Sequence, residues 1–232
     1  MNRILTIYHG SGMIVEKPTL GKGNPNNDYG LGFYCTREIE LAKEWACGEN
    51  NSGFANQYEL NISNLSVMAL TGEAYHILNW LALLVDNRRF RLSNDIAIEG
   101  KQYLTSIFLP DIGHYDLIIG YRADDSYFSF ANAFLNNALS LEQLSAAMRL
   151  GKLGEQTVLK SQKAFEQLRY VCSEPAHREV YYPLRSMRDR EVRQAYQVQR
   201  DTQRTLNAVY LLDVMRGGWK DDDARIPRNI PE

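Results

Sequence analysis

The feature that most constrains this chain is the stretch from Asn26 to Thr36, in which two glycines lead directly into a short apolar segment. Gly30 and Gly32 stand two residues apart, and they allow a tight turn that brings the backbone close to a ligand. The next four residues, Phe33-Tyr34-Cys35-Thr36, predict a short buried strand. Apolar residues then recur at helical spacing from Leu41 to Ala46, so a helix follows that carries Trp45. The stretch therefore predicts a unit of turn, strand and helix.

A second feature lies upstream, where Ile4-Leu5-Thr6-Ile7-Tyr8-His9 is followed by Gly10-Ser11-Gly12. The β-branched and aromatic run predicts a first strand that ends in a turn, with His9 near the strand's end. Two interpretations of His9 remain open, because a histidine at such a position can be a hydrogen-bonded core residue or a ligand-binding one. Residues 15–29 contain prolines, glycines and asparagines and predict a long loop between the two features.

Hydrophobic periodicity predicts a mixture of strands and helices along the rest of the chain. Strands are expected at residues 57–62, 65–68, 115–120 and 156–161, and helices at 73–90, 100–108, 128–137, 141–150 and 163–168. Turns are expected from Tyr170, followed by a mostly helical region over residues 185–216. Asp124 and Asp125 follow a predicted strand, where they could serve acid–base chemistry, hold a cation or cap the next helix. Capping is the commonest of these roles.

Composition limits the class of protein. The chain has 232 residues, of which 44% are hydrophobic and 23% charged, which is typical of a soluble globular protein with one large domain. A net charge of -2 gives no global reason to bind nucleic acid. The three cysteines lack metal-ligand spacing, so we expect neither a disulfide framework nor a zinc site. With no signal-peptide core and no run of membrane-spanning length, we expect a cytoplasmic protein that does not bind membranes.

The predicted helical region at residues 185–216 is rich in arginine. It contains seven arginines against four acidic residues, so its local charge is positive. Mixed charges are typical of a solvated helix face, which is the simpler interpretation. The other interpretation is a docking site for nucleic acid or an acidic protein, including an antitoxin that neutralises this chain.

Five blocks of sequence, in this order and at this spacing, resemble a bacterial family that is placed in the ADP-ribosyltransferase superfamily. They are Tyr8–Ser11, Asn27–Thr36, Ala42–Ala46, Ala123–Asp125 and Glu155–Ser161. The first blocks also resemble poly(ADP-ribose) polymerases and diphtheria-toxin-type enzymes. The resemblance covers roughly residues 1–168. It implies an α+β fold in which two small, mostly antiparallel sheets pack face to face around a cleft, with flanking helices. On this basis we expect an NAD-binding domain at residues 1–170 and a helical C-terminal extension at 171–232.

The resemblance also implies roles for individual residues. His9 would hold the nicotinamide ribose, the Gly10 backbone would bind the carboxamide, and Tyr34 and Trp45 would sandwich the nicotinamide ring. The catalytic residues implied are His9, Tyr34 and Gln156, and the NAD-binding residues are His9, Gly10, Ser11, Asp28, Gly30, Phe33, Tyr34, Thr36 and Trp45. Asp124, Asp125 and Glu155 would lie on the side of the acceptor, and no metal is expected.

The chain departs from the superfamily pattern at one position. The superfamily usually has a glutamate at the start of a late strand, whereas the best-aligned residue here is Gln156, with Glu155 beside it. Neighbouring strand residues point to opposite faces, so only one of the two can face the site, and we favour Gln156. The function expected is mono-ADP-ribosyl transfer from NAD to a protein or nucleic acid, with release of nicotinamide, in a bacterial toxin or defence effector. The alternative is an inactive module that binds NAD or another protein.

Overall fold

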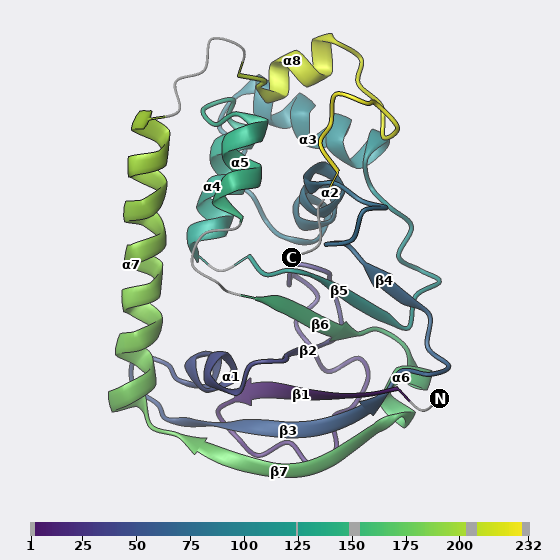
Figure 1. Cartoon of the computed structure of the whole chain (residues 1–232), viewed down its shortest axis with the longest axis vertical. Coiled ribbons are helices and arrows are strands. Elements are labelled where there is room, and N and C mark those ends of the chain that lie inside the picture. Colours follow the sequence, from purple (N-terminus) through teal and green to yellow (C-terminus); the bar gives the residue numbers. More distant parts are fainter. Residues whose placement is uncertain (1–2, 124, 149–153, 203–207, 229–232) are drawn as a thin grey trace.

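The strands of this computed structural model, which describes residues 3–123, 125–148, 154–202 and 208–228, form one mixed sheet. Their order is β4-β5-β6-β2-β1-β3-β7 (Figure 1). The strands are β1 (Ile4–Ser11), β2 (Phe33–Thr36), β3 (Gly53–Asn61), β4 (Val67–Ala69), β5 (Leu117–Tyr121), β6 (Glu155–Leu159) and β7 (Leu168–Ala176). All neighbouring pairs are antiparallel except β4 and β5. With the helices below, this arrangement confirms an α+β fold.

The expectation of two separate sheets is wrong, but the single sheet has a narrow junction. β1 and β2 are joined by one register pair, Tyr8 with Thr36, whereas β1 pairs with β3 along its full length. The sheet therefore consists of two parts, β4-β5-β6-β2 and β1-β3-β7. Because the strand pairing between the two parts is limited to one register pair, they diverge on either side of it, as Figure 1 shows.

Eight helices are assigned within the described residues. They are α1 (Ile39–Ala46), α2 (Ile77–Asn87), α3 (Asp95–Ile107), α4 (Asp125–Leu135), α5 (Leu141–Ala147), α6 (Gln162–Glu166), α7 (Arg178–Thr202) and α8 (Leu211–Arg216). Side-chain caps fix several starts: Asn94 accepts a hydrogen bond from the Ala97 amide, and Ser140 accepts one from the Gln143 amide. None of these helices has the length and apolar character required to cross a membrane.

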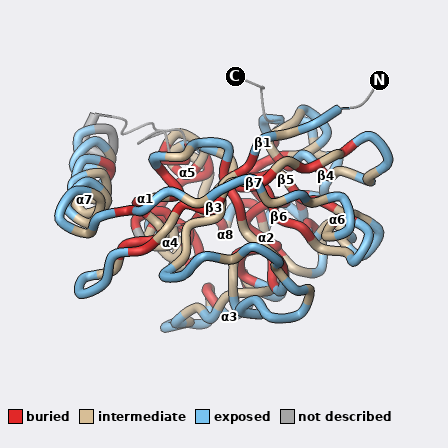
Figure 2. The backbone as a smooth tube through the Cα atoms, turned by 90° about the horizontal axis from the view of Figure 1, so that it is seen from below, coloured by how far each residue is buried: buried red, intermediate tan, exposed pale blue. Residues whose placement is uncertain are grey.

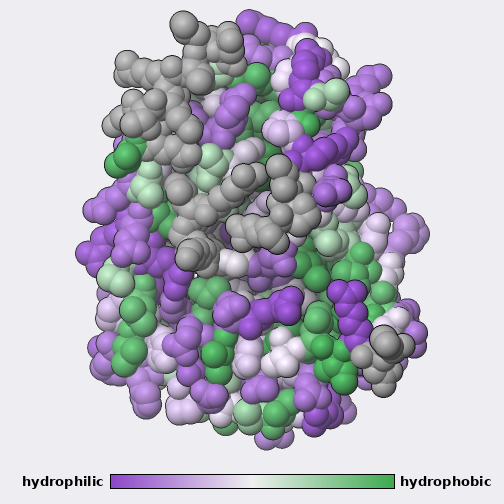
Figure 3. Space-filling view, viewed as in Figure 1, coloured by the Kyte–Doolittle hydropathy of each residue, from purple (hydrophilic) through white to green (hydrophobic). Residues whose placement is uncertain are grey.

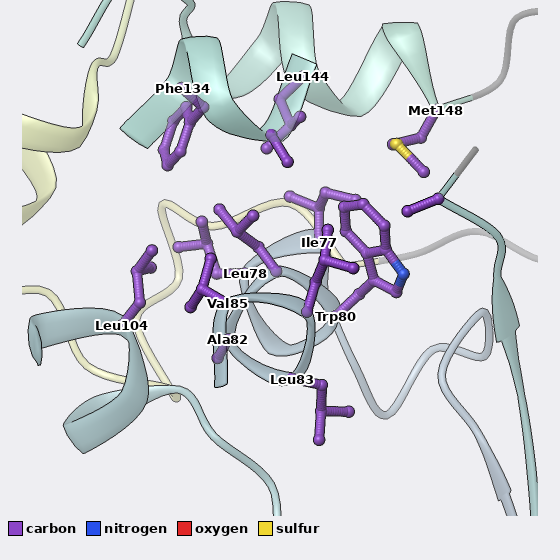
Figure 4. Close-up of a cluster of buried hydrophobic side chains, with 14 of the residues drawn as sticks. Ile77, Leu78, Trp80, Ala82, Leu83, Val85, Leu104, Phe134, Leu144 and Met148 are labelled. Atoms are coloured by element: carbon purple, nitrogen blue, oxygen red, sulfur yellow. The ribbon is translucent and has the colours of Figure 1, made fainter. Parts of the chain in front are cut away.

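The main core surrounds α2, which is apolar on nearly all sides. Its residues from Ile77 to Val85 are all buried, and Figure 4 shows several of them pointing towards Phe134 and Leu144 of the helices above. A second core cluster, which includes Ile7 and Tyr58, packs on the strands near β1 and β3. Figure 2 shows that buried residues concentrate in the middle of the molecule, between the sheet and the helices. In the same view α7 stands at one side, with much of its surface exposed. On the face seen in Figure 3, apolar and hydrophilic residues are interspersed.

The C-terminal part differs from expectation in two places. Residues 168–176 form the edge strand β7 rather than turns, and Pro175 is tolerated there because an edge strand does not need every amide for pairing. The predicted boundary at 170/171 therefore falls within a strand. The helix that follows begins at Arg178, earlier than the expected Arg185, and Leu211, Val214 and Trp219 beyond it belong to the main core.

Candidate functional site

A groove of about 1400 Å³ lies where the two parts of the sheet meet. Its walls come from β1, the end of β2, the start of α1, the ends of β4 and β5, and the start of β6. Tyr127 of α4, Met148 directly after α5 and Arg188 of α7 complete the lining. Six of the lining residues are charged: Arg37, Glu38, Glu40, Arg122, Glu155 and Arg188. The groove carries both carboxylates and guanidinium groups in a concave site, so it is the candidate functional site.

Glu155 places its carboxylate in the groove. The residue opens β6 and pairs with Tyr121 of β5, and the Thr71 hydroxyl donates a hydrogen bond to its Oε1. Thr71 lies in the turn after β4, so this hydrogen bond joins two segments of the groove wall and fixes the carboxylate. A fixed carboxylate in a groove can stabilise a positive charge that develops on a bound substrate.

Gln156 lies on the other side of β6 and is buried in the protein interior. Its Nε2 donates to Asp28 Oδ2 at 2.9 Å and to the Tyr121 carbonyl oxygen at 3.1 Å. Gln156 is 3% exposed and does not line the groove. Strand alternation puts one of the two neighbours inside and the other in the groove. The sequence analysis favoured Gln156 as the residue that faces the site, whereas in the structure Glu155 lines the groove and Gln156 does not.

Asp28 is the centre of a buried polar network. Besides Gln156, its carboxylate accepts hydrogen bonds from the Ala123 amide at 2.8 Å and from Arg88 Nη1 at 3.0 Å. Arg88 Nη1 also donates to the Ala123 carbonyl oxygen at 2.7 Å. Asp28 therefore ties the loop before β2 to the end of β5, and its oxygens are occupied by the protein. It supports the site without facing the groove.

The Gly30-Leu31-Gly32 turn is held in place by its neighbours. The Tyr34 hydroxyl donates to the Gly30 carbonyl oxygen at 2.6 Å and accepts from the Tyr29 amide at 3.1 Å. Lys160 Nζ donates to the carbonyl oxygens of Tyr29 and Leu31 at 2.6 and 2.5 Å. Gly30 has a φ of 70°, which a residue with a side chain rarely adopts. Burial raises the pKa of the Tyr34 hydroxyl, so it remains a protonated donor within this turn.

His9 lies next to β2 but faces away from the groove. Its Nδ1 is 2.7 Å from the Tyr34 carbonyl oxygen, so Nδ1 carries the proton and donates. The imidazole ring packs 4.3 Å from the ring of Phe33, centroid to centroid. Burial lowers the pKa of His9, which favours its neutral form. The structure thus brings His9, Phe33 and the Tyr34 backbone together, in a packed contact outside the groove lining.

Trp45 and Gly10 meet where α1 packs on β1. A methyl group at Gly10 would overlap the Ala42 carbonyl oxygen and crowd the Trp45 side chain, so only glycine permits this approach. The Arg122 guanidinium lies over the Trp45 ring at 4.1 Å from its centroid. Trp45 Nε1 is buried and has no hydrogen-bond partner among the described residues. Trp45 therefore stands close to the groove with a cation on its face.

α7 supplies Arg188, which closes one side of the groove. Its Nη2 and Nε bind the two carboxylate oxygens of Glu44 on α1, at 2.6 and 3.1 Å. Glu44 is 3% exposed, so this bidentate pair neutralises a buried charge and fixes α7 against α1. At this position the arginine-rich helix packs on the domain.

The remaining predicted residues have local roles or lie outside the described part. Thr36 lines the groove, and its hydroxyl accepts from the Glu38 amide at 3.2 Å. Ser11 Oγ accepts from the Met13 amide at 3.3 Å, which stabilises the turn after β1. Asp124 lies outside the described residues, and for Asp125 only the backbone at the start of α4 is described. Over the described ranges, no cluster of three or more potential metal ligands is present.

Sequence reasoning missed three groove residues: Thr71, Arg122 and Arg188. Thr71 sits in a turn after a short strand, where nothing in the sequence distinguishes it. Arg122 had a usable signal, because it follows a buried strand directly, as functional residues of open sheets often do. Arg188 was one of several arginines in a helix, and only tertiary contact singles it out.

Comparison with known proteins places the chain in a family and goes no further. No curated protein matches it, and no solved structure matches it. A family model matches residues 5–170, which include every residue of the groove lining except Ile4 and Arg188. Because this match spans most of the sequence, the chain belongs to the family described as "Protein of unknown function (DUF3990)".

Proposed function

We propose that this chain is a mono-ADP-ribosyltransferase that binds NAD in the groove, releases nicotinamide and transfers ADP-ribose to a protein or nucleic-acid acceptor. The observation that carries the proposal is the position of Glu155. Its carboxylate faces the groove from the start of a late strand, beside the end of β5, where Arg122 lies over Trp45. The resembling superfamily usually has a glutamate at the start of a late strand, and Glu155 stands one residue before the best-aligned position, Gln156.

The chemistry of the reaction matches these groups. Breaking the bond between nicotinamide and ribose develops positive charge on the ribose, and a fixed carboxylate stabilises that charge. Glu155, held by Thr71, supplies the carboxylate, so it replaces Gln156 in the role that the sequence analysis assigned. The role of Trp45 in stacking the leaving ring stays a prediction from the resemblance, because its ring carries the Arg122 guanidinium and is not part of the groove lining. The wider role as a toxin or defence effector, and its antitoxin partner, stay predictions from the resemblance.

One observation favours the alternative, a module that binds NAD or another protein without turnover. His9 is packed against Phe33, and the Tyr34 hydroxyl is engaged within the Gly30 turn, so neither faces the groove. An enzyme that used both side chains would have to rearrange this region when it binds NAD. A module that binds another protein through the groove would not need this rearrangement.

The decisive experiment measures nicotinamide release from NAD and transfer of labelled ADP-ribose to lysate acceptors. For an enzyme, Glu155→Gln should lower nicotinamide release on the order of 100-fold while NAD still binds, because the carboxylate acts on the transition state. Glu59→Gln is the matched control, since Glu59 is a glutamate on β3 that pairs with Arg169 outside the groove. It should leave release unchanged.

Three other results are informative. Tight NAD binding by the unmodified chain without nicotinamide release would support the binding module. Absence of NAD binding would contradict the enzyme and the NAD-binding module, and would leave only the module that binds another protein. Equal activity of Glu155→Gln and the unmodified chain would show that Glu155 is not the catalytic carboxylate.

A further inference from the structure

α7 carries a line of apolar side chains that remain exposed, which we call the α7 stripe. Its members Val180, Leu184 and Met187 are 52%, 38% and 46% exposed, and they follow one another at intervals of four and three residues. These intervals place side chains on one side of a helix, and they are the spacing by which paired helices pack together. Val192, on another side of α7, is buried in the main core. Figure 2 shows α7 at one side of the molecule, where another molecule can reach it.

The charges on α7 describe the kind of molecule that fits the stripe. Three arginines of this helix already form ion pairs within the chain: Arg178 with Glu179, Arg188 with Glu44 and Arg193 with Asp189. Much of the positive charge that would attract an acidic partner is therefore neutralised by the protein itself. Glu191, four residues after Met187, continues the stripe, and it is exposed beside the exposed Arg190. One cation next to one anion at the middle of a helix is complementary to a copy of itself.

We propose that α7 pairs in the antiparallel direction with α7 of a second copy of this chain, about a two-fold axis near the middle of the helix. Arg190 of each copy then lies beside Glu191 of the other, so the same contact forms twice. Leu184 and Met187 pack across the axis, and Val180 reaches the opposite end of the second helix, where Val198 is also exposed. Parallel pairing would bring the two Glu191 side chains together, and like charges repel each other.

The extent of the contact indicates a reversible dimer. α7 has 25 residues and is about 37 Å long. A single pair of helices of this length forms a smaller interface than the standard size of about 1,600 Å², so we expect a Kd on the order of 10–100 μM. Other sides of α7 are already held by Val192 in the core and by the ion pair of Arg188 with Glu44. Each copy therefore folds without the other.

Sedimentation equilibrium of the full chain, from about 1 to 300 μM, brackets this range. The unmodified chain should pass from monomer to dimer as its concentration rises. Leu184→Glu and Met187→Glu each place a carboxylate within the stripe, and each should weaken the dimer at least about 10-fold, because the charge loses water when the helices pair. Ile98→Glu is the matched control, since Ile98 is 43% exposed on α3. It should dimerise as the unmodified chain does.

A charge exchange at the middle of the helix tests the two-fold arrangement. Arg190→Glu and Glu191→Arg should each dimerise more weakly by themselves, because each opposes like charges across the axis. An equal mixture of the two variants should form a heterodimer that is tighter than either homodimer. The double variant, in which the two residues are exchanged within one chain, should also recover dimerisation. Unspecific association of apolar surfaces would not show this recovery.

The inference would be overturned by a chain that stays monomeric throughout this range, or by Leu184→Glu and Met187→Glu variants that both dimerise as tightly as the unmodified chain. A monomeric chain whose α7 stripe instead binds an amphipathic peptide of leucine and glutamate would assign the stripe to another protein. Failure of the charge exchange, with loss of dimerisation in the stripe variants, would exclude the antiparallel arrangement. None of these measurements uses NAD, so their outcome is independent of the proposed function.

Discussion

At the scale of single residues, Glu155 and Gln156 show how one position along a strand decides a role. Glu155 contacts Thr71 in the groove, while Gln156 donates to the carboxylate of Asp28 in the interior. The amide of Gln156 is chemically required there, because its N–H group satisfies an acceptor that is surrounded by protein. A glutamate at this position could not donate in its charged form.

This assignment predicts the outcome of Gln156→Glu. The substitution should not raise nicotinamide release, and it should destabilise the fold by about 1–3 kcal/mol, because a carboxylate would face the buried carboxylate of Asp28. Thermal unfolding would measure the loss, which should be smaller in acid, where the new carboxyl group is protonated. Faster nicotinamide release with unchanged stability would return Gln156 to the catalytic role.

At the scale of elements, the contact between β1 and α1 positions Trp45 beside the groove. Gly10 lies against the Ala42 carbonyl oxygen and the Trp45 side chain, so the helix and strand approach more closely than side chains on β1 would allow. Arg188 then fixes α7 to α1 through Glu44. The site thus depends on three elements whose spacing is set by one glycine and one ion pair.

The close approach can be tested with a pair of glycine variants two residues apart. Gly10→Ala should lower stability by about 1–3 kcal/mol, because the added methyl group overlaps backbone atoms of α1. Gly12→Ala is the matched control, since nothing lies within 4 Å of a methyl group placed there. It should be neutral or slightly stabilising. Chemical denaturation of both variants would compare them, and equal stability would argue against tight packing at Gly10.

At the scale of the whole molecule, the C-terminal segment closes over the main core. Trp219 and Ile226 are buried in that core, and Asp221 lies against His76 at the start of α2, with 3.3 Å between Asp221 Oδ1 and His76 Nε2. Arg228 also binds the Asp221 carbonyl oxygen at 2.8 Å. The last described residues therefore belong to the same folding unit as α2.

The buried His76 predicts a pH dependence of stability. Burial lowers its pKa, with a further lowering from Arg228, although the Asp221 carboxylate opposes the shift. A histidine whose pKa is lower in the folded state gives full stability above the unfolded value of about 6.5 and loses it as the pH falls from that value towards the folded pKa. The temperature of the unfolding midpoint should therefore decrease as the pH is lowered from about 7.5 to about 5.5.

His76→Gln should reduce this fall, although His9, whose pKa is also lowered, will retain part of it. His114→Gln is the control, because the side chain of His114 is 88% exposed. Its contact with Asp111 is exposed as well, so losing it should change the stability little. If the unfolding midpoint depends on pH equally in the His76 variant and in the unmodified chain, the contact between His76 and Asp221 does not contribute to the pH dependence in this range.

Much of the fold could be predicted from local patterns. The unit of turn, strand and helix from Gly30 to Trp45, the first strand before Gly10 and the buried helix near Trp80 all follow from periodicity and glycine placement. The strand at residues 168–176 was missed because its residues alternate weakly and include Pro175, which argues against a strand unless that strand is at an edge.

The sequence by itself determined that the chain forms an α+β protein, and it identified the blocks around His9, Tyr34 and Glu155 that lie near the junction of the sheet. It could not decide which side chains face the groove, because strand register and sheet pairing arise from contacts between residues far apart. Only the tertiary structure placed Gln156 inside, Glu155 in the groove and Arg122 over Trp45. Each of these placements joins segments separated by many residues, so no local pattern contains it.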